Sequence, residues 1–217
     1  EEISGNHNTW IQMKWEQARK NQSLLVIDEI QKVENWSESV KRLFDEDRRN
    51  ATTVPVVLLG SSSLDIQKGL SESLTGRFQL INAYHWNFDE STRGYHLDFN
   101  DFMKFGGYPG SYKFKKDQIL FSNYIKHSII DTVIEKDILR NNTVKSPALF
   151  RQVFDIITSY PAQEISYNKL LGQIQDKGNI DIVKHYLKLY EGAFLIKTIH
   201  KFSGKQIKLK TSSPKII

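Results

Sequence analysis

Two adjacent carboxylates follow an apolar run near the start of the sequence. Four apolar residues, Leu24 to Ile27, lead directly into Asp28 and Glu29. A strand in the middle of a parallel α/β sheet is covered on both faces, so it is continuously apolar, and its carboxyl end opens into the ligand crevice. One carboxylate there can hold magnesium through its water shell, while its neighbour can orient and deprotonate an attacking water. The pattern favours phosphoryl-transfer chemistry, and its plain alternative is a strand followed by a polar turn.

Two further segments carry residues that suit the same chemistry. A second apolar run, Val54 to Leu59, ends in Gly60, Ser61 and Ser62, whose hydroxyls could hydrogen-bond the attacking water or a γ-phosphate. Arg77 follows Gly76, and a guanidinium can bridge phosphoryl oxygens bidentately. Taken alone, these are also consistent with a small turn and a surface arginine. The ordered series of acidic strand end, serine strand end and Gly-Arg before a strand is more specific than its parts.

The elements that would position these residues alternate between strands and helices in the first half of the chain. We expect helices at 10–20 and 36–47 and strands at 24–29, 54–59 and 78–84, which is the pattern of a parallel α/β sheet. A turn-rich cluster, Gly106 to Gly110, is predicted to be a domain junction. Beyond it we expect helices at 123–139, 147–159, 166–174 and 181–191 and two short strands at 193–199 and 206–210.

Composition limits the class of protein. The sequence has 217 residues, 39% of them hydrophobic, which suffices for a proper core. It has no cysteine, no apolar stretch near 18 residues and no signal-peptide pattern, so we expect a cytoplasmic protein with no membrane contact. The absence of cysteine removes thiolate zinc sites, and the six histidines lack metal-ligand spacing, so we interpret them as structural.

Charge is divided unevenly along the chain. Residues 1–110 carry 12 Lys+Arg against 16 Asp+Glu, a net −4, and residues 111–217 carry 18 against 9, a net +9, which together give the total of +5. A basic half is the electrostatic signature of a polyanionic partner, although a solvated basic surface explains it equally well.

The predicted helices and terminal strands of the basic half suggest a winged helix. The recognition helix would be 181–191, with Lys184, His185 and Lys188 on one side, and Lys205 and Lys208 would lie on the wing. This distribution suits phosphate contacts on DNA. The alternative is a winged helix that docks a protein and exposes its lysines to solvent.

Several segments together resemble the prokaryotic AAA+-type P-loop ATPases that carry a C-terminal domain of unknown function. The resemblance covers nearly the whole chain and is carried by the following segments: Ile27-Asp28-Glu29-Ile30-Gln31-Lys32, Leu59-Gly60-Ser61-Ser62, Gly69 to Phe78, Gly106-Gly107-Tyr108-Pro109-Gly110, Ile134 to Leu139 and Ser166 to Gly172. It implies ATP and magnesium as cofactors, with a Walker B pair in which Asp28 coordinates magnesium and Glu29 activates water. It also implies a sensor role for Ser61 or Ser62 and a role like that of an arginine finger for Arg77.

One departure from that family is large. The Walker A loop, G-x-x-x-x-G-K-[ST], does not occur, since the one Gly-Lys step is Gly204-Lys205 without the upstream glycine. We therefore expect a fragment that lacks the preceding strand and P-loop. In the sheet order that the resemblance implies, this strand would lie between the serine strand and the strand after Arg77, so its loss leaves unpaired backbone groups that a swapped strand, a partner chain or a rearranged sheet must satisfy.

The sequence thus predicts a partial P-loop NTPase parallel sheet followed by a mostly helical, winged-helix-like domain. The expected domains are a partial ATPase at 1–96, a connector at 97–122 and the helical domain at 123–217. The expected function is part of an ATPase that couples nucleotide state to engagement of DNA or protein. The alternative is a non-catalytic DNA-binding or scaffold protein whose ATPase half is degenerate.

Overall fold

The computed structural model describes residues 7–60, 73–140, 142–174, 179–202 and 213–217. The chain divides into two compact units, residues 1–80 and 81–217, and each is described here by itself.

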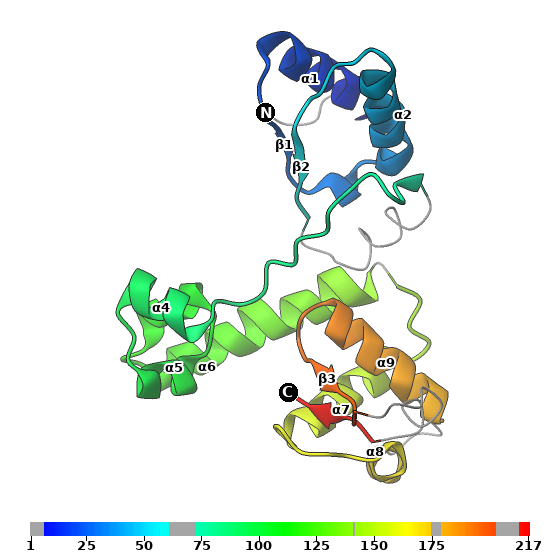
Figure 1. Cartoon of the computed structure of the whole chain (residues 1–217). Helices are drawn as coiled ribbons and strands as arrows, with labels where there is room; N and C mark the ends of the chain where they lie inside the picture. Colours follow the sequence, from blue (N-terminus) through cyan, green and yellow to red (C-terminus); the bar gives the residue numbers. More distant parts are fainter. Residues whose placement is uncertain (1–6, 61–72, 141, 175–178, 203–212) are drawn as a thin grey trace. The chain divides into compact units, whose positions relative to one another are not determined.

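The first unit is a small parallel sheet with two helices (Figure 1). Strands β1 and β2 pair in parallel with Leu25 opposite Val56 and Ile27 opposite Leu58. The elements of this unit are α1 (His7–Asn21), β1 (Leu25–Ile27), the 3-10 turn η1 (Ile30–Lys32), α2 (Trp36–Arg49) and β2 (Val56–Leu58). The strands and helices predicted up to Leu59 are therefore confirmed in type and place.

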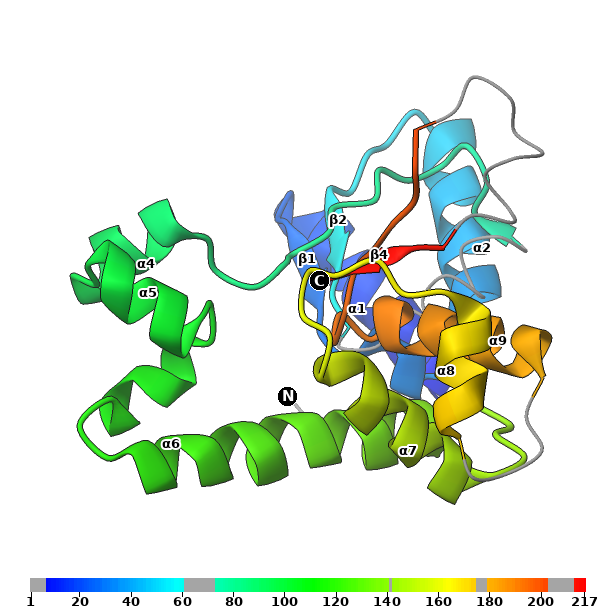
Figure 2. The same cartoon turned by 90° about the horizontal axis from the view of Figure 1, so that it is seen from below.

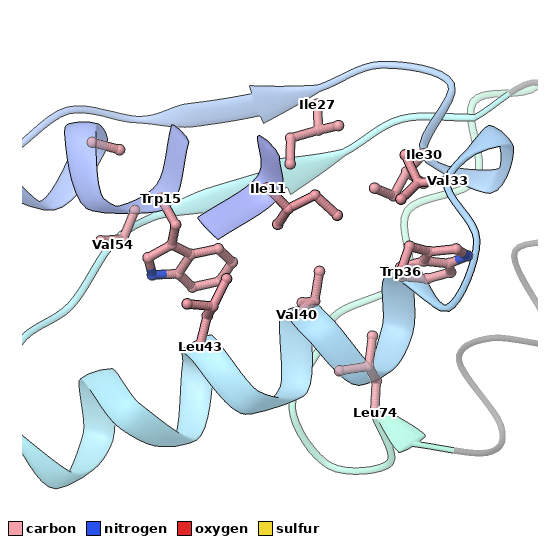
Figure 3. Close-up of a cluster of buried hydrophobic side chains, with 11 residues drawn as sticks. Ile11, Trp15, Ile27, Ile30, Val33, Trp36, Val40, Leu43, Val54 and Leu74 are labelled. Carbon is pink, nitrogen blue, oxygen red and sulfur yellow. The ribbon is translucent and has the colours of Figure 1, made fainter. Parts of the chain in front are cut away.

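The core of this unit lies between the sheet and the two helices. Ile11 and Trp15 from α1, Ile27 from β1 and Val40 and Leu43 from α2 point toward one another (Figure 3) and are buried. Burying each of these large apolar side chains contributes roughly 1.5–3 kcal/mol.

The opposite face of the sheet is open in the described residues. Val26 and Val57 are 51% and 41% exposed. The expectation that the acidic strand is covered on both faces was wrong for this chain, because the two helices that pack on the strands contribute to one face alone.

A buried carboxylate fastens α1 to α2 and to the segment that leads into β2. Asp47 accepts hydrogen bonds from Trp15 Nε1 at 2.8 Å, Arg19 Nε at 2.7 Å and Thr52 Oγ1 at 3.0 Å. Burial raises the pKa of Asp47, but these hydrogen bonds and the charge of Arg19 outweigh burial, so the net pKa lies below the usual 3.8. A depressed carboxyl pKa contributes stability that is present above pH 3.8 and is lost as the pH falls through the lower folded value.

The second unit begins with short helices that pack around aromatic side chains. Leu97, Phe105 and Tyr112 form a small core with Phe121 against it, and Tyr112 donates a hydrogen bond to the carbonyl oxygen of Gly106. These helices are α4 (Phe88–Tyr95), α5 (Phe99–Phe105), the 3-10 helix η2 (Pro109–Phe114) and α6 (Gln118–Asn123). The segment predicted as a connector at 97–122 is thus folded.

The glycines of this region make room for Trp86. A Cβ on Gly107 would lie 2.1 Å from the carbonyl oxygen of Trp86, and one on Gly94 would lie 2.5 Å from its ring. The amide of Trp86 also donates a hydrogen bond of 3.0 Å to the Gly107 carbonyl oxygen. The cluster that the sequence predicted as a domain junction therefore holds two backbone segments in direct contact.

A long helix follows and leads to the C-terminal elements. α6 continues without interruption into two π-helical segments, η3 (Tyr124–Asp131) and η4 (Val133–Leu139), and Figures 1 and 2 draw the three as one helix. Asp131 on η3 accepts hydrogen bonds from His127 and from Arg151 of α7. The ion pair between Arg151 and Asp131 joins the long helix to α7.

The remaining elements are three capped helices and a small antiparallel sheet. They are α7 (Pro147–Thr158), α8 (Tyr167–Gln173), α9 (Ile180–Gly192), β3 (Thr198–Ile199) and β4 (Lys215–Ile216). Ser146, Ser166 and Asn179 each accept a hydrogen bond from the third backbone amide of the following helix, so the N-cap predicted at Ser166 is confirmed. Tyr190 of α9 donates a hydrogen bond to the carbonyl oxygen of Phe150, which joins α9 to α7.

Further sequence predictions differ from the structure or lie outside the described residues. Residues 78–84 form no strand and are exposed, because they hydrogen-bond to neither strand of the β1–β2 sheet. The long helix begins at Gln118 instead of Asn123. β3 covers only Thr198–Ile199 of the strand predicted at 193–199 and pairs with Lys215–Ile216, while the strand predicted at 206–210 lies outside the described residues.

We expect Asp47→Asn to destabilise the first unit by about 2 kcal/mol at neutral pH, because it removes the charge that Arg19 pairs with in a buried site. The difference from the wild type should shrink below pH 3.8, where Asp47 begins to protonate on unfolding. Urea unfolding of the purified chain at several pH values measures both effects.

Glu38→Gln is the matched control, since it removes one carboxylate from the exposed face of the same helix. An equal loss of stability in both variants would show that helix charge, and not the Asp47 hydrogen bonds, is responsible.

We expect Gly107→Ala to destabilise the second unit by about 1–3 kcal/mol, because the added methyl group meets the rigid backbone of Trp86. Thermal unfolding followed by Trp fluorescence reports the change. Gly172→Ala serves as the control, because a Cβ at Gly172 meets nothing within 4 Å and alanine is the better helix former. A Gly107→Ala chain as stable as the wild type would contradict the close approach.

Candidate functional site

The acidic pair lies where the two parallel strands end. Asp28 follows the last residue of β1 directly, and the neighbouring strand β2 ends at Leu58. Two backbone hydrogen bonds extend the ladder past the strand ends, from the Leu59 amide to the Ile27 carbonyl oxygen at 2.8 Å and from the Ile30 amide to the Leu59 carbonyl oxygen at 3.1 Å. The acids therefore occupy the turn that crosses from β1 toward the end of β2, on the edge that the sequence predicted.

The two carboxylates have different surroundings. Asp28 is exposed, and its Oδ1 accepts a hydrogen bond of 2.8 Å from the Glu29 amide, which leaves Oδ2 for other ligands. Glu29 is half-buried, and its Oε2 accepts a hydrogen bond from Gln31 Nε2 at 2.9 Å and lies 3.2 Å from Lys32 Nζ. One acid is thus open to water or a cation, while the other is held by two neighbours.

The backbone at Glu29 is in the left-handed region, with φ 53° and ψ 39°. A residue other than glycine occupies this region at an energetic cost, and six other non-glycine residues of the described chain also have a positive φ. The left-handed residue turns the chain sharply, so that Ile30 enters the core while the side chains of the two acids stay at the surface of the sheet edge.

The serine turn is described as far as Gly60. Gly60 is exposed and follows Leu59, whose backbone pairs with the acidic turn on both its amide and its carbonyl. Ser61 and Ser62 lie outside the described residues. The predicted sensor role of these hydroxyls stays a prediction.

Arg77 has a partner that sequence reasoning missed. Its Nε donates to Asp45 Oδ1 at 2.9 Å and its Nη2 to Asp45 Oδ2 at 3.1 Å, so the guanidinium forms a two-point fork with a carboxylate of α2. This hydrogen-bonded fork raises the pKa of Arg77 and lowers that of Asp45. No described contact brings Arg77 to Asp28 or Glu29, and its predicted role in phosphoryl transfer stays a prediction. The residues are 32 apart in the sequence, so no local spacing could have revealed the pair.

The basic residues predicted for nucleic-acid contact are only partly described. His185 and Lys188 are exposed on α9, whereas the Lys184 ammonium lies over the ring of Tyr167, 5.1 Å from its centroid. Lys205 and Lys208 lie outside the described residues.

The donor set at the sheet edge suits magnesium better than a metal ion that is enclosed by several protein ligands. Among the described residues no group of three or more His, Cys, Asp or Glu side chains could enclose a metal ion. Magnesium usually keeps several waters and takes one or two carboxylates, so the exposed Asp28 fits it.

No helix within the described ranges is long and apolar enough to cross a membrane.

Two family models match consecutive parts of the chain. Residues 2–92 match a family model described as an AAA domain, and residues 96–217 match one described as a domain of unknown function, DUF8612. The first match supports an ATPase-like, α/β character for the N-terminal part. No solved structure matches the chain significantly.

Two proteins of similar sequence are longer than this chain. The chain is 26% identical over 205 residues to uncharacterized protein MJ1544 of Methanocaldococcus jannaschii, which covers 86% of this chain and 45% of that protein. It is 27% identical over 183 residues to an uncharacterized protein of Haemophilus influenzae, with 78% of this chain and 44% of that protein covered. The chain therefore spans about half the length of the curated relatives it matches.

Proposed function

The chain belongs to the family defined by the domain of unknown function DUF8612, and we propose that it forms part of an AAA-type ATPase. The observation that carries this proposal is the acidic turn of Asp28 and Glu29, which the ladder between β1 and β2 fixes at the carboxyl edge of a parallel sheet. Ligands of open α/β sheets bind outside this edge. The match of residues 2–92 to an AAA domain supports the same chemistry.

In this proposal the two acids divide the work. Asp28, exposed and with one oxygen uncommitted to the Glu29 amide, would hold the magnesium of a bound ATP through coordinated water. Glu29 would accept the proton of the water that attacks the γ-phosphate. Gln31 and Lys32 hold its carboxylate at the start of η1, so they position the base.

The phosphate cradle is the component that this sequence does not contain. Backbone amides of a glycine-rich loop and its lysine normally bind the β- and γ-phosphates. The chain of 217 residues holds no such loop, so we propose that it hydrolyses ATP negligibly by itself and that the whole protein supplies the loop. A partner strand from another chain is the alternative source, since the sheet has open edges within the described residues.

The second unit would convert nucleotide state into engagement of another molecule. The order of α7, α8, α9, β3 and β4 is that of a winged helix, and His185 and Lys188 are exposed on α9. With the net charge of +9 on residues 111–217, these features favour DNA over protein as the partner. The rival proposal is a non-catalytic DNA-binding or scaffold protein whose ATPase half is degenerate.

Glu29→Gln in the whole protein should lower the rate of ATP hydrolysis by roughly 10²–10⁴, because it removes the general base. The affinity for ATP should change little, since the variant keeps Asp28. Steady-state hydrolysis and equilibrium nucleotide binding measure the two quantities.

Glu34→Gln is the control, because Glu34 is an exposed acid just beyond the same turn and has no partner among the described residues. Nucleotide binding without hydrolysis in the wild-type protein would favour the degenerate alternative, and no nucleotide binding would reject the ATPase proposal.

Lys188→Gln in the whole protein should reduce the slope of log affinity for duplex DNA against log salt by about 0.9, the value for one lost phosphate contact. Fluorescence anisotropy between about 50 and 200 mM salt gives the slope. Lys145→Gln is the control, because Lys145 is exposed just before α7. An unchanged slope in Lys188→Gln would show that Lys188 contacts no phosphate, and it would remove the support for DNA binding by α9.

A further inference from the structure

Four arginines and one aspartate line an open depression of about 660 Å³ in the first unit. Arg42, Asp45 and Arg49 lie three and four residues apart on α2, so they share one face of that helix, and Arg48 adjoins them. Arg77 reaches the depression from another segment and is held there by its fork on Asp45. Four positive charges and one negative charge leave the lining with a net +3.

Two of these guanidinium groups lie exposed in the last turn of α2. Arg48 and Arg49 are exposed, and neither makes a hydrogen bond or ion pair with another residue that the structure describes. Arg42 is partly engaged, since it donates to Gln12 Oε1 at 3.1 Å and its Nη1 lies 3.9 Å from Glu46 Oε2. The Asp45 carboxylate is hydrogen-bonded by Arg77 and also interacts electrostatically with Arg48, so one negative charge is shared among the cations of the lining.

Helix stabilisation explains only part of this arrangement. Cations in the last turn of a helix interact favourably with its dipole, which accounts for Arg48 and Arg49. It does not account for Arg42, nearly two turns earlier, or for Arg77, which lies outside the helix. Cations from two separate segments therefore converge on one place.

The chemistry of the lining points to phosphate. A guanidinium presents paired N–H donors that match phosphate oxygens, and it stays charged at any physiological pH. The five lining residues include no aromatic or aliphatic side chain, so nothing there would stack on a base or enclose a nucleoside. Contacts of this kind bind the sugar-phosphate backbone without reading its sequence.

We propose that the depression lined by Arg42, Arg48, Arg49 and Arg77 binds backbone phosphates of a nucleic acid. This contact lies on the first unit, whereas α9 belongs to the second. It does not depend on the ATP chemistry of Asp28 and Glu29. Net charge conceals it, because residues 1–110 carry a net −4.

The test is the binding of labelled duplex DNA and duplex RNA to the whole protein carrying Lys188→Gln, with and without the double change Arg48→Gln and Arg49→Gln. Removing two phosphate contacts should reduce the slope of log affinity against log salt by about 2, equally for unrelated sequences. The DNA and RNA arms identify which nucleic acid supplies the phosphates. Using Lys188→Gln as the background keeps any contribution of α9 apart.

Two matched variants make the result decisive. Lys20→Gln with Lys116→Gln also removes two positive charges, but from exposed positions outside the depression, and should leave the slope unchanged. Arg48→Lys with Arg49→Lys keeps the charges and should retain the slope. If the double glutamine variant loses its helical circular dichroism, the single variants Arg48→Gln and Arg49→Gln are measured instead, each with an expected reduction of about 0.9.

Three outcomes would overturn the proposal. The first is an equal slope in the Lys188→Gln protein with and without the double change Arg48→Gln and Arg49→Gln. The second is an equal loss of slope in the control that carries Lys20→Gln and Lys116→Gln. The third is binding of inorganic tripolyphosphate that the double change Arg48→Gln and Arg49→Gln abolishes, without binding of either duplex, which would make the depression a site for a small phosphate compound.

Discussion

The parallel pairing of β1 and β2 is the constraint on which the candidate site depends. Three residue pairs form the ladder, and the hydrogen bonds of Ile27, Leu59 and Ile30 carry it into the following turn. Because each side chain in a strand faces opposite to the next, a slip of one residue would bring Val26 into the core and expose Ile27. The burial of Ile27 against α1 and α2 therefore fixes the register, and the register fixes where Asp28 and Glu29 emerge.

The surface charge of this protein depends on which charged side chains are paired, more than on the net charge of each half. The first half is acidic overall, yet its acids are largely committed: Asp47 to Trp15 and Arg19, and Asp45 to Arg77. The arginines that remain at the end of α2 face outward without such partners in the described residues. A sum over 110 residues averages these two populations and hides the positive face. The surface potential follows from which charges are paired, and pairing is a property of the fold.

The sequence predicted features that depend on neighbours along the chain. Apolar periodicity located α2, Ser166 marked the start of α8, and the position of Asp28 after an apolar run placed it at a strand end. Features that depend on distant residues were missed. The Arg77–Asp45 fork and the Trp15–Asp47 hydrogen bond each join residues 32 positions apart, and the contact of Gly107 with Trp86 lies between backbone atoms. Residues 78–84 show the converse error, because their strand-like composition cannot make a strand without an edge to pair with.

The exposed, irregular stretch at 78–84 separates two sets of buried side chains. In the described part of the chain, the core around Trp15 draws on residues up to Leu74, and the core around Phe105 begins at Leu97. Neither set needs a side chain from the other to fill its interior. Recombination at this stretch would therefore leave both interiors intact, so evolution could join such an N-terminal half to different C-terminal halves without redesigning either.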